Sequence, residues 1–387
     1  MHTMTEWKEY KLGELTIDGK GSYGIAAPAV DYDVEKYTYL RITDINDDGT
    51  LNKNGLKSVD DKNASKYLLQ QNDIVFARTG ASVGRSYFYD ERDGELVYAG
   101  FLIKYSIDPL KVNPRILKFY THSQAYYDWI QTVDNGATRG NINAQTYASM
   151  PIVLPKRQEQ DKIVSILTSL DDKIDLLRRE NATLEAMAET LFRQWFVMEA
   201  KEEWVEGKLG DVCKYVADKI DITDIERDTY ITTENMCPNK QGVVKPSSIP
   251  ENIKVTKYLV NDVLLSNIRP YFKKLWLSDR NGGCSNDVLC IRSKNEVFKY
   301  FTYYTIRQDE FFDYVMLGSK GCKMPRGDKQ HIMNWQIKIP SDAILNSFNE
   351  IVGKGIAKIR NNNRQIQTLI QTRDGLLPRL MGGEIKV

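Results

Sequence analysis

Between Gln158 and Val197 the chain has the hydrophobic pattern of one long amphipathic helix. Apolar residues recur there at every seventh position, namely Ile163, Leu170, Leu177, Leu184 and Leu191. The segment contains neither glycine nor proline, and charged stretches fill the other positions. A seven-residue apolar repeat is the pattern of a coiled-coil seam. We therefore expect a helix of about 40 residues, which is roughly 60 Å long at about 1.5 Å per residue.

A weaker copy of this seam lies near the C-terminus. Its apolar positions are Phe348, Ile351, Val352, Ile359, Ile366, Leu369 and Leu376. Gly353 and Gly355 interrupt the start of this segment and leave the length of the second helix open. Because both seams are apolar and need a partner, we expect the two helices to pair in antiparallel fashion. The alternative is two separate helical linkers, each capping its own domain.

The segments that precede the two helices have the short-period pattern of β-strands. Residues 37–45, 73–78, 86–90 and 96–107 are rich in β-branched and aromatic side chains and are separated by Gly, Asn and Asp. The second half repeats this pattern, and each half also contains one amphipathic helical segment, at 115–133 and 297–316. These patterns predict an α+β domain of about 150 residues in each half, with a mixed sheet and helices.

The two halves are copies of one unit. Trp7 corresponds to Trp204, the segment QNDIVFA from Gln71 corresponds to VNDVLLS from Val260, and MPIVLP ends at Pro155 as WQIKIP ends at Pro340. The offset falls from 197 to 185 residues, which indicates net deletions in loops of the second copy. The predicted organisation is pseudo-symmetric: a domain at 1–155, a helix at 156–198, a domain at 199–340 and a helix at 341–387.

Composition is that of a soluble globular protein, with 42% hydrophobic and 27% charged residues. The five cysteines all lie in the second half without CxxC spacing, which favours reduced thiols over zinc or disulfides. The N-terminal residues lack the apolar core of a signal peptide, and no apolar run is long enough for a membrane span, so we expect a cytoplasmic protein. A net charge of +1 means that any nucleic-acid binding must come from local basic patches.

Familiar catalytic motifs are missing from the sequence. Residues 19–24 match GxGxxG, but Pro28 argues against the helix that a dinucleotide site requires. P-loop, HExxH, GxSxG and [DN]PP[YF] motifs are absent, and three scattered histidines are too few for a metal cluster. We therefore predict neither a catalytic site, nor a metal, nor a cofactor bound by this chain. An enzyme with an unrecognised site, such as a nuclease, remains an alternative.

Four predicted loops combine cationic side chains with Gly, Asn, Ser or aromatic residues. They are 77–89 and 135–147 in the first copy, and 266–276 and 318–331 in the second. Arginine can bridge two acceptors of guanine, asparagine or glutamine can bridge adenine, and lysine can meet phosphate. Since the loops recur at equivalent places, they suit two readers of DNA that share one scaffold. The alternative is that they are ordinary solvated loops.

The candidate DNA contacts come from these loops and from one neighbouring segment. In the first copy they are Arg41, Arg78, Thr79, Ser82, Arg85, Arg139, Asn141, Asn143 and Gln145. In the second copy they are Asn267, Arg269, Tyr271, Lys273, Lys320, Lys323, Arg326 and Lys329. Arg139 and Arg269 are the first choices, one in each half. Arg41 lies in an alternating segment and is equally explained as the exposed face of a strand. The aromatic residues of 115–133 fit core packing better than base stacking.

A second kind of candidate site is a surface for a partner protein. Apolar side chains gather near the ends of the two predicted helices, at Leu191, Phe192, Trp195, Phe196, Leu376 and Leu377. This is more aromatic surface than one partner helix would cover. The alternative is that these side chains pack against the adjoining domain.

The chain resembles a known family across nearly its whole length, the specificity subunit HsdS of type I restriction-modification systems. The motifs that carry the resemblance are WKEYKLGEL near the N-terminus, GKGSYGI near residue 20, GATRGNINAQTYASMPIVLPKRQEQDKIVSIL at 136–167 and LLPRLMGGEI at 376–385. The resemblance implies two target-recognition domains separated by two long helical regions, each domain reading one half of a bipartite DNA site. The second copy departs from the pattern, with KGCKMPRGDKQ in place of TRGNIN.

The resemblance also implies partners. Two modification subunits (HsdM), which carry S-adenosylmethionine and methylate adenine, would bind the helical region, and restriction subunits (HsdR) would add ATP- and Mg-dependent translocation and cleavage. If both domains dock in major grooves on one face of DNA, the half-sites lie about one helical turn apart, roughly 34 Å. The helical rod would then act as a ruler for the spacer. The main alternative is a stand-alone DNA-binding scaffold or repressor without a methyltransferase partner.

Overall fold

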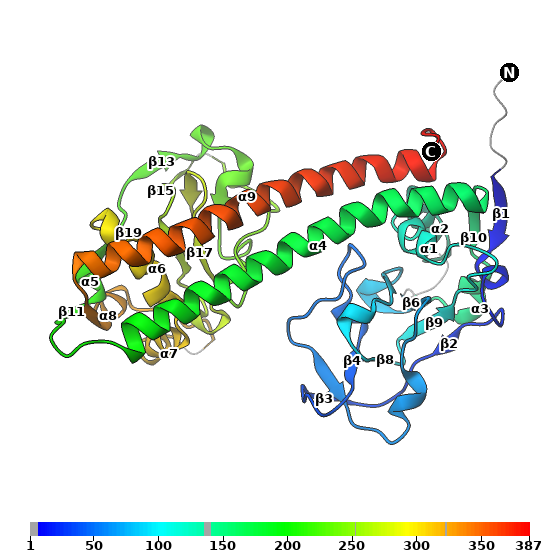
Figure 1. The fold of residues 1–387 in the computed structure, drawn as a ribbon, viewed down its shortest axis with the longest axis horizontal. Helices are drawn as coiled ribbons and strands as arrows, with labels where there is room; N and C mark the ends of the chain where they lie inside the picture. Colours follow the sequence, from blue (N-terminus) through cyan, green and yellow to red (C-terminus); the bar gives the residue numbers. More distant parts are fainter. Residues whose placement is uncertain (1–6, 135–140, 252, 322) are drawn as a thin grey trace. The chain divides into compact units, whose positions relative to one another are not determined.

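The computed structural model describes residues 7–134, 141–251, 253–321 and 323–387 (Figure 1). It divides into two compact units. Unit 1 comprises Met1–Asp175 with Ile366–Val387, and unit 2 comprises Leu176–Gln365. Both units combine sheets with helices, so the predicted α+β class is confirmed. The boundary between the units falls inside both long helices, and the four-part division made from the sequence stays a prediction.

The described residues of unit 1 form two four-stranded sheets and one two-stranded sheet. The first sheet has the order β2 (Ser22–Tyr23), β9 (Leu102–Ser106), β6 (Asp73–Ala77) and β7 (Ser86–Phe88). The second has the order β3 (Ala29–Asp31), β5 (Lys57–Val59), β4 (Thr38–Leu40) and β8 (Leu96–Tyr98), with β4 and β8 parallel. The third pairs β1 (Lys8–Lys11) with β10 (Pro151–Leu154).

Strand β6 is buried on both faces and separates two hydrophobic cores. Successive side chains of a strand point to opposite faces. Accordingly, Ile74 and Phe76 belong to the core that includes the helices, whereas Val75 and Ala77 belong to a core on the other face of the sheet. This explains why the segment is a continuous apolar run rather than an alternating one.

Unit 2 repeats this design. Its first sheet has the order β12 (Cys213–Tyr215), β19 (Val288–Ser293), β16 (Val263–Ser266) and β17 (Leu275–Leu277), which matches the first sheet of unit 1. Its second has the order β13 (Lys219–Asp221), β15 (Lys254–Tyr258), β18 (Gly282–Cys284) and β14 (Tyr230–Ile231). One pair of strands in this sheet is again parallel, β14 with β18. The strand pairing differs in one respect: β15 pairs with β18, which follows it in the sequence, whereas β5 of unit 1 pairs with β4, which precedes it. A third sheet pairs β11 (Val205–Lys208) with β20 (Gln336–Ile339).

The short helices lie where the amphipathic segments were predicted, but each segment is broken into two helices. In unit 1 the break separates α1 (Arg115–Tyr120) from α2 (Gln124–Asp134), where the Thr121 hydroxyl donates back to the carbonyl of Lys118, 3.0 Å away. In unit 2 the extended residue Gln308 separates α6 (Lys299–Arg307) from α7 (Asp309–Leu317). The remaining short helices are α3 (Ala144–Ala148), α5 (Leu209–Val212) and α8 (Lys329–Met333).

Aromatic side chains of α1 and α2 pack inward, as expected from the sequence. Tyr120 and Tyr126 are buried in the core of unit 1, and Trp129 packs against that core. Tyr127 is an exception because 42% of its surface is exposed.

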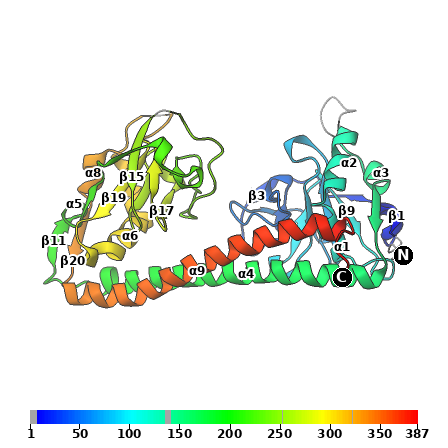
Figure 2. The same ribbon diagram turned by 90° about the horizontal axis from the view of Figure 1, so that it is seen from above.

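The two long helices are α4 (Arg157–Arg193, 37 residues) and α9 (Asp342–Met381, 40 residues), visible along their length in Figure 2. Within unit 1, the first part of α4 packs against the last part of α9, and Arg373 donates to Asp171 across 3.0 Å. Within unit 2, Asn362 donates to Glu180 across 2.8 Å. Residue numbers rise along one helix as they fall along the other. The predicted antiparallel pair is therefore confirmed, and separate linkers are excluded.

The glycines near the start of α9 do not break it. Gly353 lies against the ring of Tyr300 in α6, where an added Cβ would come within 3.2 Å of the ring. The missing side chain therefore allows close approach of α9 to the core of unit 2.

Candidate nucleic-acid interface

In unit 1 the loop after β6 and the loop before α3 lie side by side. Thr79 and Asn141 form an antiparallel β-bridge, and the amide of Ile142 donates to the carbonyl of Arg78 across 2.9 Å. The Arg78 guanidinium donates from Nε and Nη2 to Oδ1 of Asn141, at 3.3 and 3.2 Å, and lies over the ring of Tyr23. Two loops that are separated by more than 60 residues thus share one surface of side chains suited to DNA.

In unit 2 the loop after β16 meets the loop before α8 in the same way. Ile268 and Arg326 form a β-bridge, and the amide of Arg269 donates to the carbonyl of Pro325 across 2.8 Å. The amide of Gly327 donates to the carbonyl of Asn267 across 3.2 Å. The backbone arrangement is therefore shared between the two units, while the side chains that it presents differ.

The cations of the unit 2 loops fall into two groups. Lys273 pairs with Asp309 at 2.9 Å, Lys320 with Asp328 at 2.7 Å and Arg326 with Asp287 at 3.2 Å, while Lys329 lies over the ring of Tyr215. Arg269 and Lys323 are exposed, and among the described residues neither has an ion-pair partner. An acidic partner competes with an anionic ligand for a cation. Arg269 and Lys323, for which neither an acidic partner nor a ring contact is found among the described residues, are therefore the candidates most available for DNA.

Two arginines of unit 1 are held by acidic groups. Arg41 donates to both carboxylate oxygens of the buried Asp44, at 2.8 and 2.6 Å, and this hydrogen bonding raises the pKa of Arg41. It follows the end of β4 and opens a short turn, so it is not the exposed face of a strand. Arg85 pairs with Asp47 at 2.6 Å. Arg41 is thus committed to the fold, and we leave it out of the proposal below.

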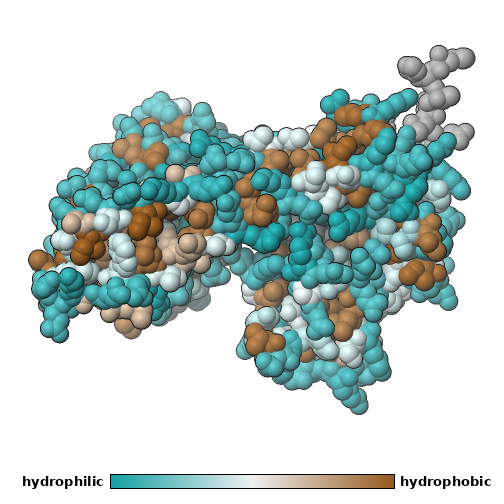
Figure 3. Space-filling view, in the orientation of Figure 1, coloured by the Kyte–Doolittle hydropathy of each residue, from teal (hydrophilic) through white to brown (hydrophobic). Residues whose placement is uncertain are grey.

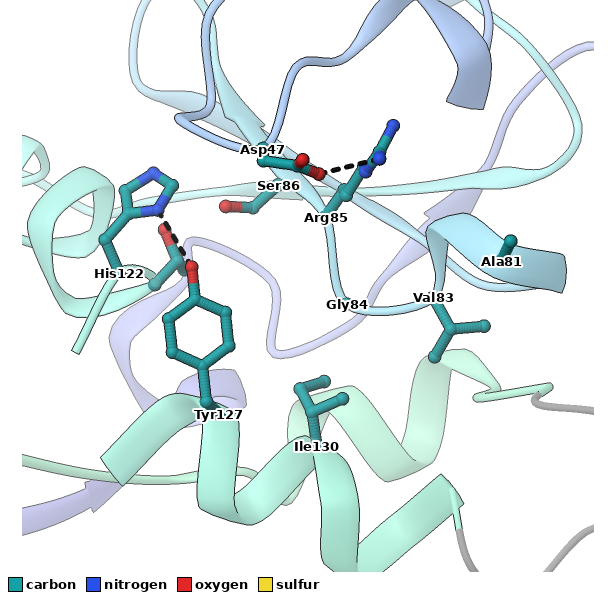
Figure 4. A pocket seen from close by; sticks show the side chains of 10 residues that line it. Asp47, Ala81, Val83, Gly84, Arg85, Ser86, His122, Tyr127 and Ile130 are labelled. Atoms are coloured by element: carbon teal, nitrogen blue, oxygen red, sulfur yellow. Dashed lines mark hydrogen bonds and ion pairs between the residues drawn. The ribbon is translucent and has the colours of Figure 1, made fainter. Parts of the chain in front are cut away.

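The Arg85–Asp47 ion pair borders a pocket of about 240 Å³ in unit 1 (Figure 4). His122 and Tyr127 line its other side, with Nδ1 of His122 3.4 Å from the hydroxyl of Tyr127. Burial lowers the pKa of His122, which favours the neutral form of its ring. Gly84 forms part of the wall at a φ of 84° and lies against Ile130. At this pocket, the loop that carries Arg85 therefore lies against α2.

The other candidate side chains of the loops have mixed roles. Asn143 caps α3 by accepting from the amide of Thr146 at 2.9 Å, and Gln145 is exposed on that helix. Ser82 is half-buried in the turn Gly80–Ser82. Oδ1 of Asn267 is buried and has no hydrogen-bond partner among the described residues. Arg139, a first choice from the sequence, lies outside the described residues.

The predicted partner surface is corrected by the burial of its aromatic residues. Phe192 and Phe196 are 3% and 7% exposed and pack with Phe301 and Phe348 in the core of unit 2. Leu377 lies in the core of unit 1, and Leu191, Trp195 and Leu376 are half-buried against the two cores. The alternative, packing against the chain's own domain, accounts for the three buried side chains. Phe192 and Phe196 pack on α6 and α9 in unit 2, and Leu377 packs in the core of unit 1.

Other chemistry is sparse in the described part of the chain. No group of three or more His, Cys, Asp or Glu residues there is arranged to hold a metal ion. Cys213, Cys237, Cys284 and Cys290 are free thiols. Among the described helices, none combines the length and the apolar character needed to cross a membrane.

Comparison with known proteins identifies the scaffold. Residues 4–186 match the family model of the type I restriction modification DNA specificity domain. The first half of the chain is therefore similar to this type I specificity family. Among its relatives, the specificity subunit of the type I restriction enzyme MjaIX from Methanocaldococcus jannaschii is 25% identical over 305 residues, which are 67% of this chain and 66% of the relative. The HindI specificity subunit from Haemophilus influenzae is 28% identical over 204 residues, which are 50% of this chain and 41% of the relative. The chain thus matches two thirds or less of the length of these relatives.

A solved structure supports the fold. The S subunit of the type I restriction-modification system from M. genitalium aligns with a TM-score of 0.58 over 98% of this chain and 97% of that protein. Its sequence identity is 13%, so the likeness concerns the fold alone. The resemblance to the type I specificity family that the sequence motifs suggested is confirmed by the family model and the two relatives.

Proposed function

We propose that this chain is the DNA specificity subunit of a type I restriction-modification complex, and that units 1 and 2 each read one half of a bipartite site. The observation that carries the proposal is the shared bridge between two loops in each unit, Thr79 with Asn141 and Ile268 with Arg326. One backbone arrangement presents two different sets of cationic and amide side chains. That is what two readers of different half-sites require, because base contacts specify sequence and the scaffold only positions them.

Within each half, the candidate residues divide by the contact that they would make. In unit 1, Arg78 is the candidate for a bidentate base contact, together with the exposed Asn141 and Gln145. In unit 2, Arg269 takes the same role, and Lys323 would meet phosphate. Arg139, Thr79, Ser82, Arg85 and Asn143 stay candidates in unit 1, as do Asn267, Tyr271, Lys273, Lys320, Arg326 and Lys329 in unit 2.

The long helices are proposed to set the spacer between the half-sites and to dock the modification subunits. At about 1.5 Å per residue, helices of 37 and 40 residues are roughly 55 to 60 Å long, more than one turn of DNA. Their exposed apolar residues, with exposed fractions of 36–63%, are Ile166, Leu176, Met187 and Ile351. Figure 3 shows apolar groups as separate brown areas in a mostly hydrophilic surface, which suits partner contacts made at several small patches.

The likeness to this family suggests the partners. We propose two HsdM-like modification subunits, which would carry S-adenosylmethionine, and HsdR-like restriction subunits that would use ATP and Mg²⁺. This chain would contribute recognition rather than catalysis and would act in the cytoplasm, where the host DNA lies.

Methylation mapping of DNA tests the proposal directly. Cells that express the modification subunits with this chain should acquire methylated adenine at one bipartite sequence, and cells without the chain should not. Arg269→Ala should relax one half-site only, whereas Lys201→Ala, which removes a charge from an exposed turn of unit 2, should leave both half-sites unchanged. Recovery of the chain bound to a specific DNA site without any methylation would instead support a stand-alone binding protein.

A further inference from the structure

Left-handed backbone conformations are concentrated in two loops of unit 2. In the part of the chain that the structure describes, six residues other than glycine have a positive φ. Four of them lie in loops at 237–242 and 266–276: Asn239, Lys240, Arg269 and Lys273, with φ between 50° and 61°. Long side chains rarely adopt this conformation, and when they do the strain is held by the surrounding structure and often marks a functional site.

The equivalent loop of unit 1 uses glycine at the same two positions. The amide of Ala77 donates to the carbonyl of Arg85, and the amide of Ser266 donates to the carbonyl of Lys274, which fixes an offset of 189 residues. With this offset, Gly80 (φ 71°) corresponds to Arg269 and Gly84 (φ 84°) to Lys273. Unit 2 therefore keeps a glycine-type backbone while placing cations on it. A cation at a strained position indicates that its side chain is needed there.

The strained loop is firmly held. The amide of Asn239 donates to the carbonyl of Phe272 across 2.9 Å, and the amide of Lys240 donates to the carbonyl of Lys273 across 2.8 Å. Nζ of Lys240 and Nζ of Lys273 each lie 2.9 Å from the same carboxylate oxygen of Asp309. The turn Pro270–Phe272 between the two strained residues is thus pre-organised before any ligand binds.

This turn presents aromatic rings to solvent. Tyr271 and Phe272 are 47% and 39% exposed, with ring centroids 4.6 Å apart. Nζ of Lys274 lies 5.9 Å from the Phe272 ring, and the exposed Arg269 precedes the turn. In unit 1 the corresponding residues are Ser82 and Val83, so only unit 2 has rings here.

We propose that Phe272, supported by Tyr271, contacts the 5-methyl group of a thymine in the half-site that unit 2 reads. The thymine methyl is the apolar group that base edges offer in the major groove, where Arg269 would bridge a guanine. The Phe272 ring has neither a hydrogen-bond donor nor an acceptor, and the surrounding cations favour a polyanion over an apolar protein partner. This inference rests on the proposed function of unit 2 as a DNA reader.

Thymine-to-uracil replacement removes that methyl group and nothing else. The test uses the full chain assembled with its modification subunits, and duplexes that contain the methylated site found by mapping. Each thymine of each half-site is replaced in turn by deoxyuridine, and dissociation constants are measured by fluorescence anisotropy. We expect one replacement in the second half-site to weaken binding about fourfold, as the loss of one buried methyl-sized group should.

Variants assign the effect to the ring. Phe272→Ala should bind the thymine and uracil duplexes equally, and Phe272→Leu should retain part of the difference. Phe101→Ala removes a ring that is 60% exposed in unit 1 and should retain all of it. Melting curves and assembly with the modification subunits check that each variant is folded.

Three outcomes would overturn the inference: a second half-site without any A·T pair, wild-type binding that is insensitive to every uracil replacement there, or sensitivity that persists in Phe272→Ala. In each case site-specific binding itself would leave the proposed function standing. Equal binding of the site and a scrambled duplex would count against the proposed function instead. A fourth outcome would overturn the inference about Phe272: unstacking of a base step, detected as 2-aminopurine fluorescence that depends on Phe272, because the ring would then act as a wedge.

Discussion

Nδ2 of Asn362 in α9 donates a hydrogen bond to Oδ1 of Asn181 in α4, across 2.8 Å, at a position where Asn362 is fully buried. The same nitrogen lies 2.8 Å from Oε2 of Glu180, while Oδ1 of Asn362 has no partner among the described residues. The repeat offset of 185 places the apolar Leu177 in α4 where Asn362 stands in α9. A buried asparagine in a helical seam favours one register at a cost in stability. The polar contact therefore breaks the symmetry of an otherwise repeated seam.

Substitution of Asn362 should separate the effects of polarity and charge. Asn362→Leu should leave the free energy of unfolding unchanged or raise it by about 1 kcal/mol, because it removes a buried polar group with an unsatisfied oxygen. Asn362→Asp should lower it by about 3 kcal/mol, because a buried carboxylate would face Glu180. Urea denaturation measures both. Asn361→Asp, at an exposed position of the same helix, is the control and should change little; equal stability of the two aspartate variants would contradict the prediction.

The left-handed backbone of Arg269 in unit 2 should lower the free energy of unfolding, and we expect the side chain to be kept there for its function. Arg269→Gly should raise the free energy of unfolding by about 1 kcal/mol, since glycine adopts a φ of 50° without the clash of a Cβ. The reverse change in unit 1, Gly80→Ala, should lower it by about 1 kcal/mol. A Cβ at Gly80 would meet no described atom within 4 Å, so the loss would report backbone strain alone.

Calorimetry on both variants measures the two changes in the free energy of unfolding, and binding assays on the same variants measure DNA affinity. Arg269→Gly should gain stability and lose selectivity at the second half-site, which is the usual conflict between stability and activity at a strained site. A variant that gained neither stability nor altered selectivity would show that Arg269 is relaxed at its left-handed position.

The parts of the fold that follow from local periodicity were predictable. The heptad stripe from Ile163 to Leu191 defines α4, and the buried run at Asp73–Ala77 defines β6. The break between α1 and α2 was not predictable, because the hydrophobic pattern continues through Thr121.

The candidate site was predictable only in outline. Basic loops at equivalent places could be found in the sequence, but the bridge between Thr79 and Asn141 depends on long-range packing that a local pattern does not encode. The left-handed backbone of Arg269 was missed, although alignment of its loop with Gly80 of the first copy carried a signal for it. The burial of Phe192 was also open from sequence, because an exposed interface and a domain core have the same apolar pattern.

Acid should weaken unit 1 through Asp171 of α4. Burial alone would raise the pKa of this carboxyl, but ion pairs with Lys118 at 2.6 Å and Arg373 at 3.0 Å outweigh burial and lower it. A carboxyl whose pKa is lower in the folded state stabilises the fold above its unfolded pKa, near 3.8, and this contribution is lost as pH falls through the folded pKa.

Asp171→Asn should therefore lower the free energy of unfolding by about 2 kcal/mol at pH 7 and reduce its dependence on pH below about 4. Denaturation between pH 2.5 and 7 measures both effects. Asp172→Asn, at the exposed neighbouring position, should change stability by less than 1 kcal/mol. An acid dependence that is the same in Asp171→Asn and the wild type would contradict the assignment.

Arg78 should control the first half-site in the way that Arg269 controls the second. Its Nε and Nη2 donate to Oδ1 of Asn141, and the group lies 4.8 Å from the ring of Tyr23, so the guanidinium is held in one orientation. The remaining N–H groups of Nη1 and Nη2 are left for two acceptors on one base. Arg78→Ala should cost about 1 to 3 kcal/mol in binding and relax one position of the first half-site, with the second unchanged. Arg78→Lys should fail to restore selectivity, because lysine lacks the planar fork. Methylation mapping measures this, with Arg115→Ala, an exposed arginine at the start of α1, as the control. Weaker methylation at all sites alike, with the selectivity of both half-sites unchanged, would mean that Arg78 contacts phosphate rather than a base.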